Sequence, residues 1–209
     1  MIELDKGQVL IREDDPSAYL FNVTAGALKI YKLLPDGRRQ VLGFLFIGDF
    51  LGFGGQTNYG FTAEALTPVQ LCRFPRQRFM PLLDECPSLE REVLGKASSE
   101  LSCAQEHMVV LGRKTARERI ASFFKDLSIR TERLDGPIEQ IHLPMTRTDI
   151  ADYLGLTTET VSRVFTEFRQ QGRIRLEPDG NVHLLDPSGL EAIAEGKEPR
   201  SRERTPARK

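Results

Sequence analysis

Three polar side chains have the spacing needed to read the edges of DNA bases. Glu159, Ser162 and Arg163 stand at positions i, i+3 and i+4, which share one face of a helix. An arginine can donate two hydrogen bonds to guanine O6 and N7, a glutamate can accept one from cytosine N4, and a serine can contact an adjacent base. The spacing therefore predicts a recognition helix that presents these residues to the major groove of double-stranded DNA.

The elements that must position this face form a predicted helix-turn-helix. Ile150, Ala151 and Leu154 have the spacing of the buried face of a short helix, and Gly155 can supply the positive φ of the turn. A second helix should begin near Thr157 or Thr158. The alternative is an ordinary amphipathic helical hairpin with a solvated outer face. That alternative does not explain why the capping residue, the glycine and the polar face all stand at the positions that a helix-turn-helix requires. The residues better placed for phosphate than for bases are Thr146, Arg147, Thr148, Thr158 and Thr160.

Composition favours a nucleic-acid partner only for the C-terminal part. The 209 residues carry a net charge of −1, but residues 1–112 hold 11 basic and 14 acidic side chains, and residues 113–209 hold 18 and 16. No apolar run approaches the ~18 residues of a membrane span, and the first residues do not resemble a signal peptide. We therefore expect a cytoplasmic protein that does not bind membranes. Three cysteines without a Cys-x-x-Cys pair predict neither a disulfide nor a metal site.

The fold class expected from the strand and helix patterns is α+β. Short apolar strands predict an N-terminal β-roll, in which Pro35-Asp36-Gly37 closes one hairpin. A second hairpin is expected between Phe61–Leu66 and Val69–Phe74, around Thr67-Pro68. A wing is expected from Arg173–Glu177 and Asn181–Leu185. The predicted domains are a β-roll at 1–87, a dimerisation helix and hinge at 88–112, a winged helix-turn-helix at 113–196 and a disordered basic tail at 197–209.

The long helix expected from about Ser88 to Leu111 has an apolar seam. Its apolar positions are separated by gaps of four and three residues, which is close to a heptad repeat. An exposed seam on a linking helix indicates a two-fold dimer, and packing against the chain's own β-roll is the alternative. The predicted interface residues are Leu89, Val93, Ala97, Leu101, Ala104, Met108 and Leu111.

Together these features resemble the CRP/FNR family of bacterial transcription regulators. The resemblance rests on the β-roll turns at Gly26, Pro35-Asp36-Gly37 and 48–53, on the helix start at 114–121 and on the helix-turn-helix, and it covers nearly the whole chain. The segment 159–163, Glu-Thr-Val-Ser-Arg, is similar to the Glu-x-x-Ser-Arg of the FNR/FixK branch. The resemblance implies a jelly roll like that of cyclic-nucleotide-binding domains and a homodimer on a TTGAT-type inverted repeat. It also implies an activator that recruits RNA polymerase in anaerobic, respiratory or nitrogen-metabolism control.

The resemblance does not extend to the family's cyclic-nucleotide site. That site uses a Gly-Glu pair for the ribose and an Arg-Ser or Arg-Thr pair for the phosphate. This chain has Gly52-Phe53 at the first position and no arginine in 58–63. Since a buried phosphate needs a cation or aimed amides, we expect no cyclic nucleotide to bind.

The oxygen-sensing branch of the family ligates a [4Fe–4S] cluster with four cysteines. Cys72 stands where the fourth ligand would fall, but the three leader cysteines are not in this sequence, and Cys86 and Cys103 lie elsewhere. Haem is disfavoured, because no histidine pairs with Cys72 in the sequence. We expect no cofactor, Cys72 as an ordinary buried residue, and control through the abundance of the protein. The alternative is a [4Fe–4S] regulator whose cysteine-bearing N-terminal segment is absent from this chain, with Cys72 as the remaining ligand.

A cupin-like enzyme is the alternative from a different class. Such an enzyme needs a metal triad or a nucleophile and base. No histidine precedes His107, so the predicted barrel cannot supply imidazole ligands. We therefore expect a regulator and not an enzyme.

Overall fold

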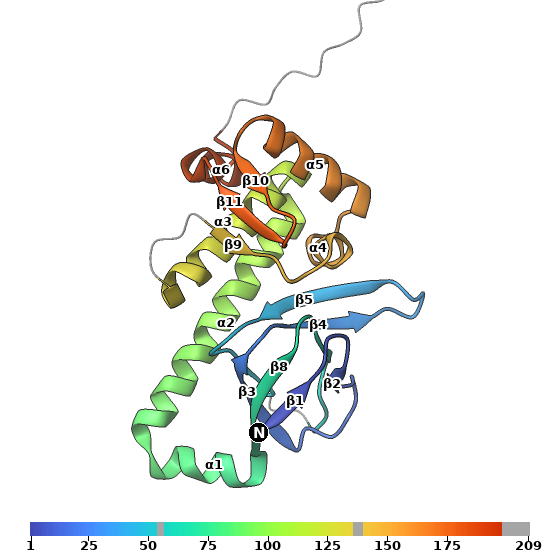
Figure 1. The fold of residues 1–209 in the computed structure, drawn as a ribbon. Helices are drawn as coiled ribbons and strands as arrows, with labels where there is room; N and C mark the ends of the chain where they lie inside the picture. The colour runs from blue at the N-terminus through green and yellow to red at the C-terminus, as the bar shows by residue number, and fades with distance from the viewer. Residues whose placement is uncertain (54–56, 136–139, 198–209) are drawn as a thin grey trace, which may run out of the picture. The chain divides into compact units, whose positions relative to one another are not determined.

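Two four-stranded sheets form the N-terminal part of the protein (Figure 1). The computed structural model describes residues 1–53, 57–135 and 140–197. By its internal contacts the chain divides into two units. The first holds residues 1–108 together with 144–158, and the second holds the remaining described residues. The first unit thus contains part of the segment that the sequence assigned to the DNA-binding domain.

The core of the first unit lies between its two sheets. Phe21 and Leu71 come from the sheet ordered β1-β8-β3-β6, and Leu28 and Ala63 come from the sheet ordered β2-β7-β4-β5. All four side chains are buried, which confirms the predicted β-roll. The strands are β1 (Ile2–Leu4), β2 (Val9–Ile11), β3 (Tyr19–Ala25), β4 (Leu28–Leu33), β5 (Arg39–Leu45), β6 (Phe50–Leu51), β7 (Thr62–Ala65) and β8 (Val69–Pro75).

One predicted hairpin is correct and the other is wrong. β4 and β5 pair antiparallel around the predicted turn at Pro35-Asp36-Gly37. β7 and β8 do not pair, because β7 lies between β2 and β4, whereas β8 lies between β1 and β3. The chain crosses from one sheet to the other at Thr67-Pro68, where Thr67 Oγ1 accepts a hydrogen bond from the Ala27 N–H at 2.9 Å. The sequence of two apolar strands around a turn is the same kind of pattern whether the strands pair with each other or belong to different sheets.

Gly26 is needed where the crossover passes it. Its φ is +80°, and a β-carbon at this position would lie 2.1 Å from the carbonyl oxygen of Pro68. We expect Gly26→Ala to lower the free energy of unfolding by more than about 2 kcal/mol, measured by urea denaturation, since left-handed strain adds to a backbone clash.

Gly37 is the matched control for this substitution. Its φ is +83°, but nothing lies within 4 Å of a β-carbon there. Gly37→Ala should therefore cost only the conformational part, about 1–2 kcal/mol. Equal losses for the two variants would show that the approach to Pro68 is unimportant.

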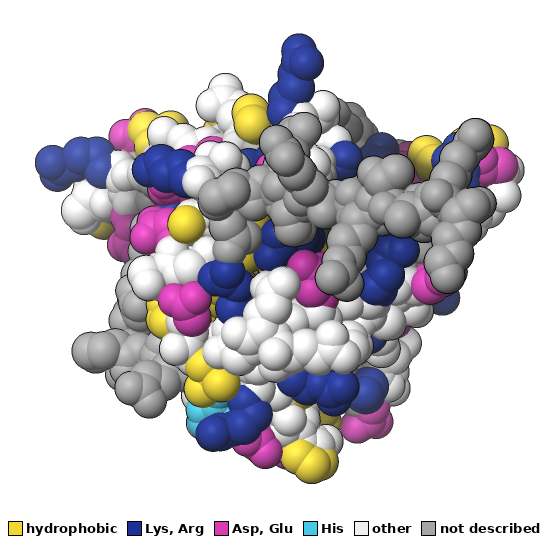
Figure 2. All heavy atoms as spheres, turned by 90° about the horizontal axis from the view of Figure 1, so that it is seen from above, with side chains coloured by type: hydrophobic (Ala, Val, Ile, Leu, Met, Phe, Trp, Pro, Cys, Tyr) yellow, Lys and Arg dark blue, Asp and Glu magenta, His cyan; other side chains and the backbone are white. Residues whose placement is uncertain are grey.

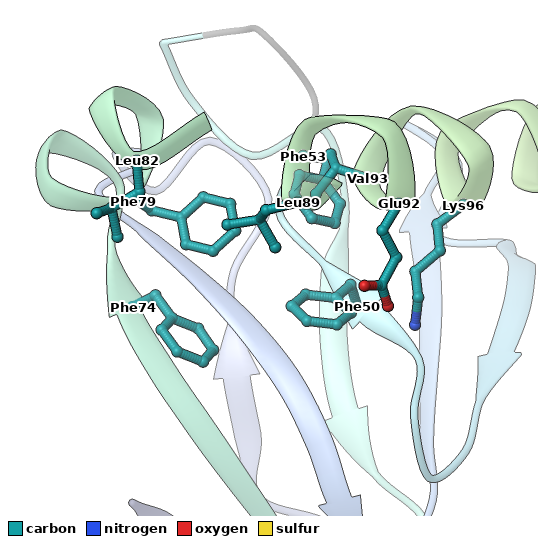
Figure 3. A pocket seen from close by; sticks show the side chains of 9 residues that line it. All are labelled: Phe50, Phe53, Phe74, Phe79, Leu82, Leu89, Glu92, Val93 and Lys96. Carbon is teal, nitrogen blue, oxygen red and sulfur yellow. The ribbon is translucent and has the colours of Figure 1, made fainter. Parts of the chain in front are cut away.

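An apolar pocket of about 330 Å³ lies where two helices follow the β-roll (Figure 3). The helices are α1 (Arg76–Glu85), which the sequence did not predict, and α2 (Pro87–Arg113). Leu89 and Val93 of α2 point into the pocket towards phenylalanine rings of the β-roll. Both side chains are half-buried beside their own β-roll, and their place in a dimer seam stays a prediction. The pocket is lined by Phe50, Phe53, Phe74, Phe79, Leu82, Leu89, Glu92, Val93 and Lys96.

The exposed apolar line of α2 begins at Leu94, which is next to the predicted Val93. Leu94 and Leu101 are each 60% exposed and Met108 is 68% exposed, at intervals of seven residues. The predicted Ala97 and Ala104 are also exposed and lie between them, which gives a regular a and d pattern. The predicted Leu111, at the end of the helix, is half-buried.

The second unit has helices and a small sheet ordered β10-β11-β9. α2 continues through the predicted hinge at Gly112 and ends at Arg113. Every helix that the structure describes is too short or too polar to span a lipid bilayer. The predicted tail lies, apart from Lys197, outside the described residues. The elements are α3 (Ala116–Asp135), β9 (Gln140–His142), α5 (Thr158–Gln170, of which Thr158 falls in the first unit), β10 (Ile174–Leu176), β11 (Asn181–Leu184) and α6 (Pro187–Ala194).

Candidate nucleic-acid interface

The first helix of the motif, α4 (Arg147–Leu154), has well-defined ends. Thr146 and Asp149 form a capping box: the Asp149 N–H donates to Thr146 Oγ1 at 3.1 Å, and the Thr146 N–H donates to Asp149 Oδ2 at 3.0 Å. The helix ends at Gly155, which has φ 61° and ψ 42°. This left-handed conformation is the one predicted for the turn.

The second helix, α5, presents the predicted base-reading residues to solvent. Glu159, Ser162 and Arg163 are all exposed. The structure therefore places the three side chains on one accessible helix face, as the spacing predicted, and their contact with bases stays a prediction. The apolar side of the same helix is buried through Val161, Val164, Phe165 and Phe168.

The predicted phosphate-contacting residues lie around the two helix starts. Thr146, Thr148 and Thr158 are exposed, and Arg147 and Thr160 are half-buried. Burial lowers the pKa of Arg147 to about 10, so its guanidinium is still protonated at neutral pH. Each side chain has some solvent access, and contact with phosphate is a prediction for all five.

Two of the arginines near α5 are engaged within the protein. Arg173 Nη1 lies 2.8 Å from Asp186 Oδ2, the carboxylate that caps α6, and Arg175 Nε lies 2.9 Å from Glu177 Oε1. Figure 2 shows basic and acidic side chains interspersed on the face that it draws. Residues 163–175 hold four arginines and one acidic residue, Glu167, and these ion pairs make two of the four arginines less available to phosphate. Arg163 and Arg169 form no ion pair with any residue that the structure describes.

The predicted wing is a hairpin in the second unit. β10 and β11 pair antiparallel, with Ile174 opposite Leu184. Gly180 in the connecting turn has φ 88°, and the Asn181 N–H donates to Asp179 Oδ1 at 3.0 Å. The turn at Pro178-Asp179-Gly180 therefore closes the hairpin that the sequence predicted as a wing.

The cysteines do not offer the ligand set of an iron–sulfur cluster. Cys72 is half-buried on β8, Cys86 is exposed between α1 and α2, and Cys103 is exposed on α2. Among the described residues, no three histidine, cysteine, aspartate or glutamate side chains are grouped so that they could hold a metal ion. The residues of this chain therefore do not fit a [4Fe–4S] cluster.

Sequence reasoning missed the contact that α4 makes with the β-roll. Lys29 on β4 and Arg39 on β5 reach the acidic side chains of α4. Lys29 and Asp149 are 120 positions apart in the chain. No local pattern of spacing could have paired them.

Known protein families match both ends of the chain. A Crp-like helix-turn-helix domain matches residues 118–193, and a cyclic nucleotide-binding domain matches residues 1–86. The solved structure of FixK2 from Bradyrhizobium japonicum has a TM-score of 0.84 and 33% sequence identity, and covers 92% of this chain and 95% of that one. The fold class predicted from the sequence is thus confirmed.

Named relatives are similar to this chain in sequence over most of their length. The nitrogen fixation regulation protein FixK of Bradyrhizobium diazoefficiens is 42% identical over 92% of this chain and 81% of its own. The transcriptional activatory protein AadR of Rhodopseudomonas palustris is 41% identical over 90% and 78%, and the transcriptional activator Anr of Pseudomonas aeruginosa is 39% identical over 93% and 80%. These relatives are regulators and not enzymes, as expected for this chain. The chain belongs to the CRP/FNR family of DNA-binding transcription regulators.

Proposed function

We propose that this protein is a homodimeric, FNR/FixK-type regulator that binds a TTGAT-type inverted repeat. The observation that carries the proposal is the exposed face of α5, where Glu159, Ser162 and Arg163 stand together above a buried apolar side. Their donors and acceptors match guanine and cytosine edges in the major groove. Direct readout of a G·C pair within each half-site is the role assigned to them.

The exposed line on α2 supports the homodimer. Leu94, Leu101 and Met108 repeat every seven residues, and alanines stand between them. Apolar side chains in this pattern pack well against the same helix of a second chain. A two-fold dimer would present two recognition helices, which suits an inverted repeat.

We infer that the protein activates transcription by recruiting RNA polymerase, in low-oxygen, respiratory or nitrogen-metabolism control. The names of the relatives support this, since they include transcriptional activators and nitrogen fixation regulators. The β-roll is proposed to work without a cyclic nucleotide. Phe53, which replaces the family's ribose-binding glutamate, lines the apolar pocket, and residues 58–63 contain no arginine.

A mobility-shift titration tests the proposed function. The full chain should bind a duplex carrying a TTGAT-type inverted repeat about 10³-fold or more tighter than a scrambled duplex at the same salt concentration. Transcription from a promoter with this repeat should rise when the protein is added to purified RNA polymerase. Equal affinity for the two duplexes would refute sequence-specific binding.

The DNA affinity of the protein should not depend on exposure to oxygen. Since its cysteines do not fit a cluster, we expect the purified chain to be colourless and to bind the repeat equally well before and after exposure to oxygen. Iron and acid-labile sulfide assays, with parallel titrations in an anaerobic chamber, provide the measurement. About four iron and four sulfide per chain, or a loss of binding in air, would contradict this and favour the [4Fe–4S] alternative.

A further inference from the structure

Ion pairs join the β-roll to α4 within the first unit. Lys29 Nζ lies 2.9 Å from Asp149 Oδ1, and Arg39 Nη2 lies 2.9 Å from the same oxygen. Arg39 Nη2 also lies 2.8 Å from Asp152 Oδ2, one turn along α4. We call Lys29, Arg39, Asp149 and Asp152 the α4 ion-pair cluster.

The centre of this cluster is buried. The side chain of Lys29 is 7% exposed and that of Asp149 is 3% exposed. Glu64 on β7 gives Lys29 a second acceptor at 3.0 Å. Because a buried charge without a partner is strongly destabilising, each side chain of the pair holds the other in place.

Aromatic packing lies beside the ion pairs. The ring of Tyr153 on α4 has its centroid 5.2 Å from that of Phe44 on β5 and stacks at 4.1 Å on His107 of α2. The backbone oxygen of Tyr153 accepts a hydrogen bond from Gln40 Nε2 at 3.3 Å. Charged and apolar contacts therefore fix the same helix against the same strands.

Asp149 serves the cluster and the start of α4 with different oxygens. While Oδ1 faces Lys29 and Arg39, Oδ2 accepts from the N–H and the hydroxyl of Thr146, at 3.0 and 2.6 Å. Burial alone would raise the pKa of Asp149, but the hydrogen bonds from Thr146 and Lys29 outweigh it and hold this pKa below its ordinary value. The carboxylate is therefore ionised at neutral pH and fixes the backbone turn at which α4 begins.

We propose that Lys29 and Arg39 are positioning residues for DNA binding, acting through Asp149 on the first turn of α4. The inference rests on the proposed function, because Thr146, Arg147 and Thr148 of that turn are the residues assigned to phosphate. Thr146 and Thr148 are exposed while the ion pairs of the cluster are formed, so both remain accessible to a DNA phosphate. The β-roll thus sets the geometry of the phosphate contacts and, through it, the DNA affinity.

Lys29→Met in the full chain tests this role. The substitution keeps most of the length of the side chain and removes its charge, so the start of α4 should lose its fixed position. We expect affinity to fall about tenfold on both the inverted repeat and the scrambled duplex, since phosphate contacts carry no sequence information. The dependence of affinity on salt should become shallower by about one unit for each phosphate that the variant no longer binds. Hydrogen exchange at the amides of α4 should become faster.

Lys32→Met is the matched control. Lys32 lies on the same strand, β4, and pairs at 2.9 Å with Glu13 of the β-roll, and its side chain is 47% exposed. It has the same chemistry but no ion pair with α4 among the described residues. DNA affinity, salt dependence and exchange at α4 should all match the wild type.

A second pair of variants covers the case in which Lys29→Met fails to fold. Arg39 and Asp152 are 23% and 24% exposed, so Arg39→Met, Asp152→Asn and the double variant should fold. Their effects on α4 exchange should be non-additive, as expected of residues that act as a pair. Lys29→Arg keeps the positive charge and should therefore retain most of the wild-type DNA affinity. If Lys29→Met and Lys32→Met behave alike, or if the Arg39 and Asp152 effects simply add, the inference is overturned. If the wild-type protein bound the repeat and the scrambled duplex equally well, the proposed function would be refuted. Hydrogen exchange at α4 in the same variants would then still test whether the α4 ion-pair cluster fixes this helix.

Discussion

Arg163→Ala should abolish most of the preference for the inverted repeat and leave non-specific binding almost unchanged. Arg163 is exposed on α5 and forms no ion pair with any described residue, so its guanidinium is available for a bidentate contact to guanine. Loss of one such contact costs about 1–3 kcal/mol, or roughly 5- to 150-fold in affinity for each half-site. Mobility-shift titrations on repeat and scrambled duplexes at one salt concentration give both values.

Arg169→Ala is the control on the same helix. Arg169 is also exposed, but it stands in the last turn of α5, away from Glu159 and Ser162. A phosphate contact at that place would weaken binding to the two duplexes by the same factor. If Arg163→Ala also weakened both duplexes equally, Arg163 would be a phosphate contact, and base reading would have to be assigned to other residues.

Leu101→Glu should convert the protein from a dimer to a monomer. Leu101 is 60% exposed and stands midway between Leu94 and Met108 on α2. A carboxylate at this place in each chain would put two like charges in an apolar interface, where desolvation and repulsion both oppose association. Sedimentation should give half the wild-type mass. Affinity for the inverted repeat should fall by more than about a hundredfold, because two half-sites are no longer engaged together.

Ser99→Glu separates the seam from a general effect of charge on α2. Ser99 is exposed and stands five positions after Leu94, on the side of the helix opposite the apolar line. The variant should sediment as a dimer and bind DNA normally. A Leu101→Glu protein of unchanged mass would exclude the seam from the interface.

Features that depend on neighbouring residues could be predicted from the sequence. The turn at Gly155, the exposed face of α5 and the hairpin at Pro35-Asp36-Gly37 each follow from a few positions and their φ preferences. The long helix was predicted within two residues of its observed ends. Local periodicity decides these features, and tertiary packing does not override it.

Features that depend on distant parts of the chain could not be predicted. The choice between Val93 and Leu94 for the dimer seam depends on which face the phenylalanines of the β-roll cover. The partners of β7 and β8 depend on where the chain crosses between sheets. The pairing of Lys29 with Asp149 needs the folded β-roll and α4 together. The spacing of apolar residues and the positions of turn residues contain none of this information.

The first unit is assembled from two stretches of chain, with residues 109–143 between them. A ribosome delivers the β4–β5 surface long before it delivers α4, and synthesis at roughly 5–20 residues per second leaves that surface uncovered for several seconds. During this interval the ammonium group of Lys29 has Glu64 but not Asp149 as a partner. A fragment that stops at residue 108 would keep this incomplete surface permanently, so truncation between the two matched domains removes part of the N-terminal unit itself.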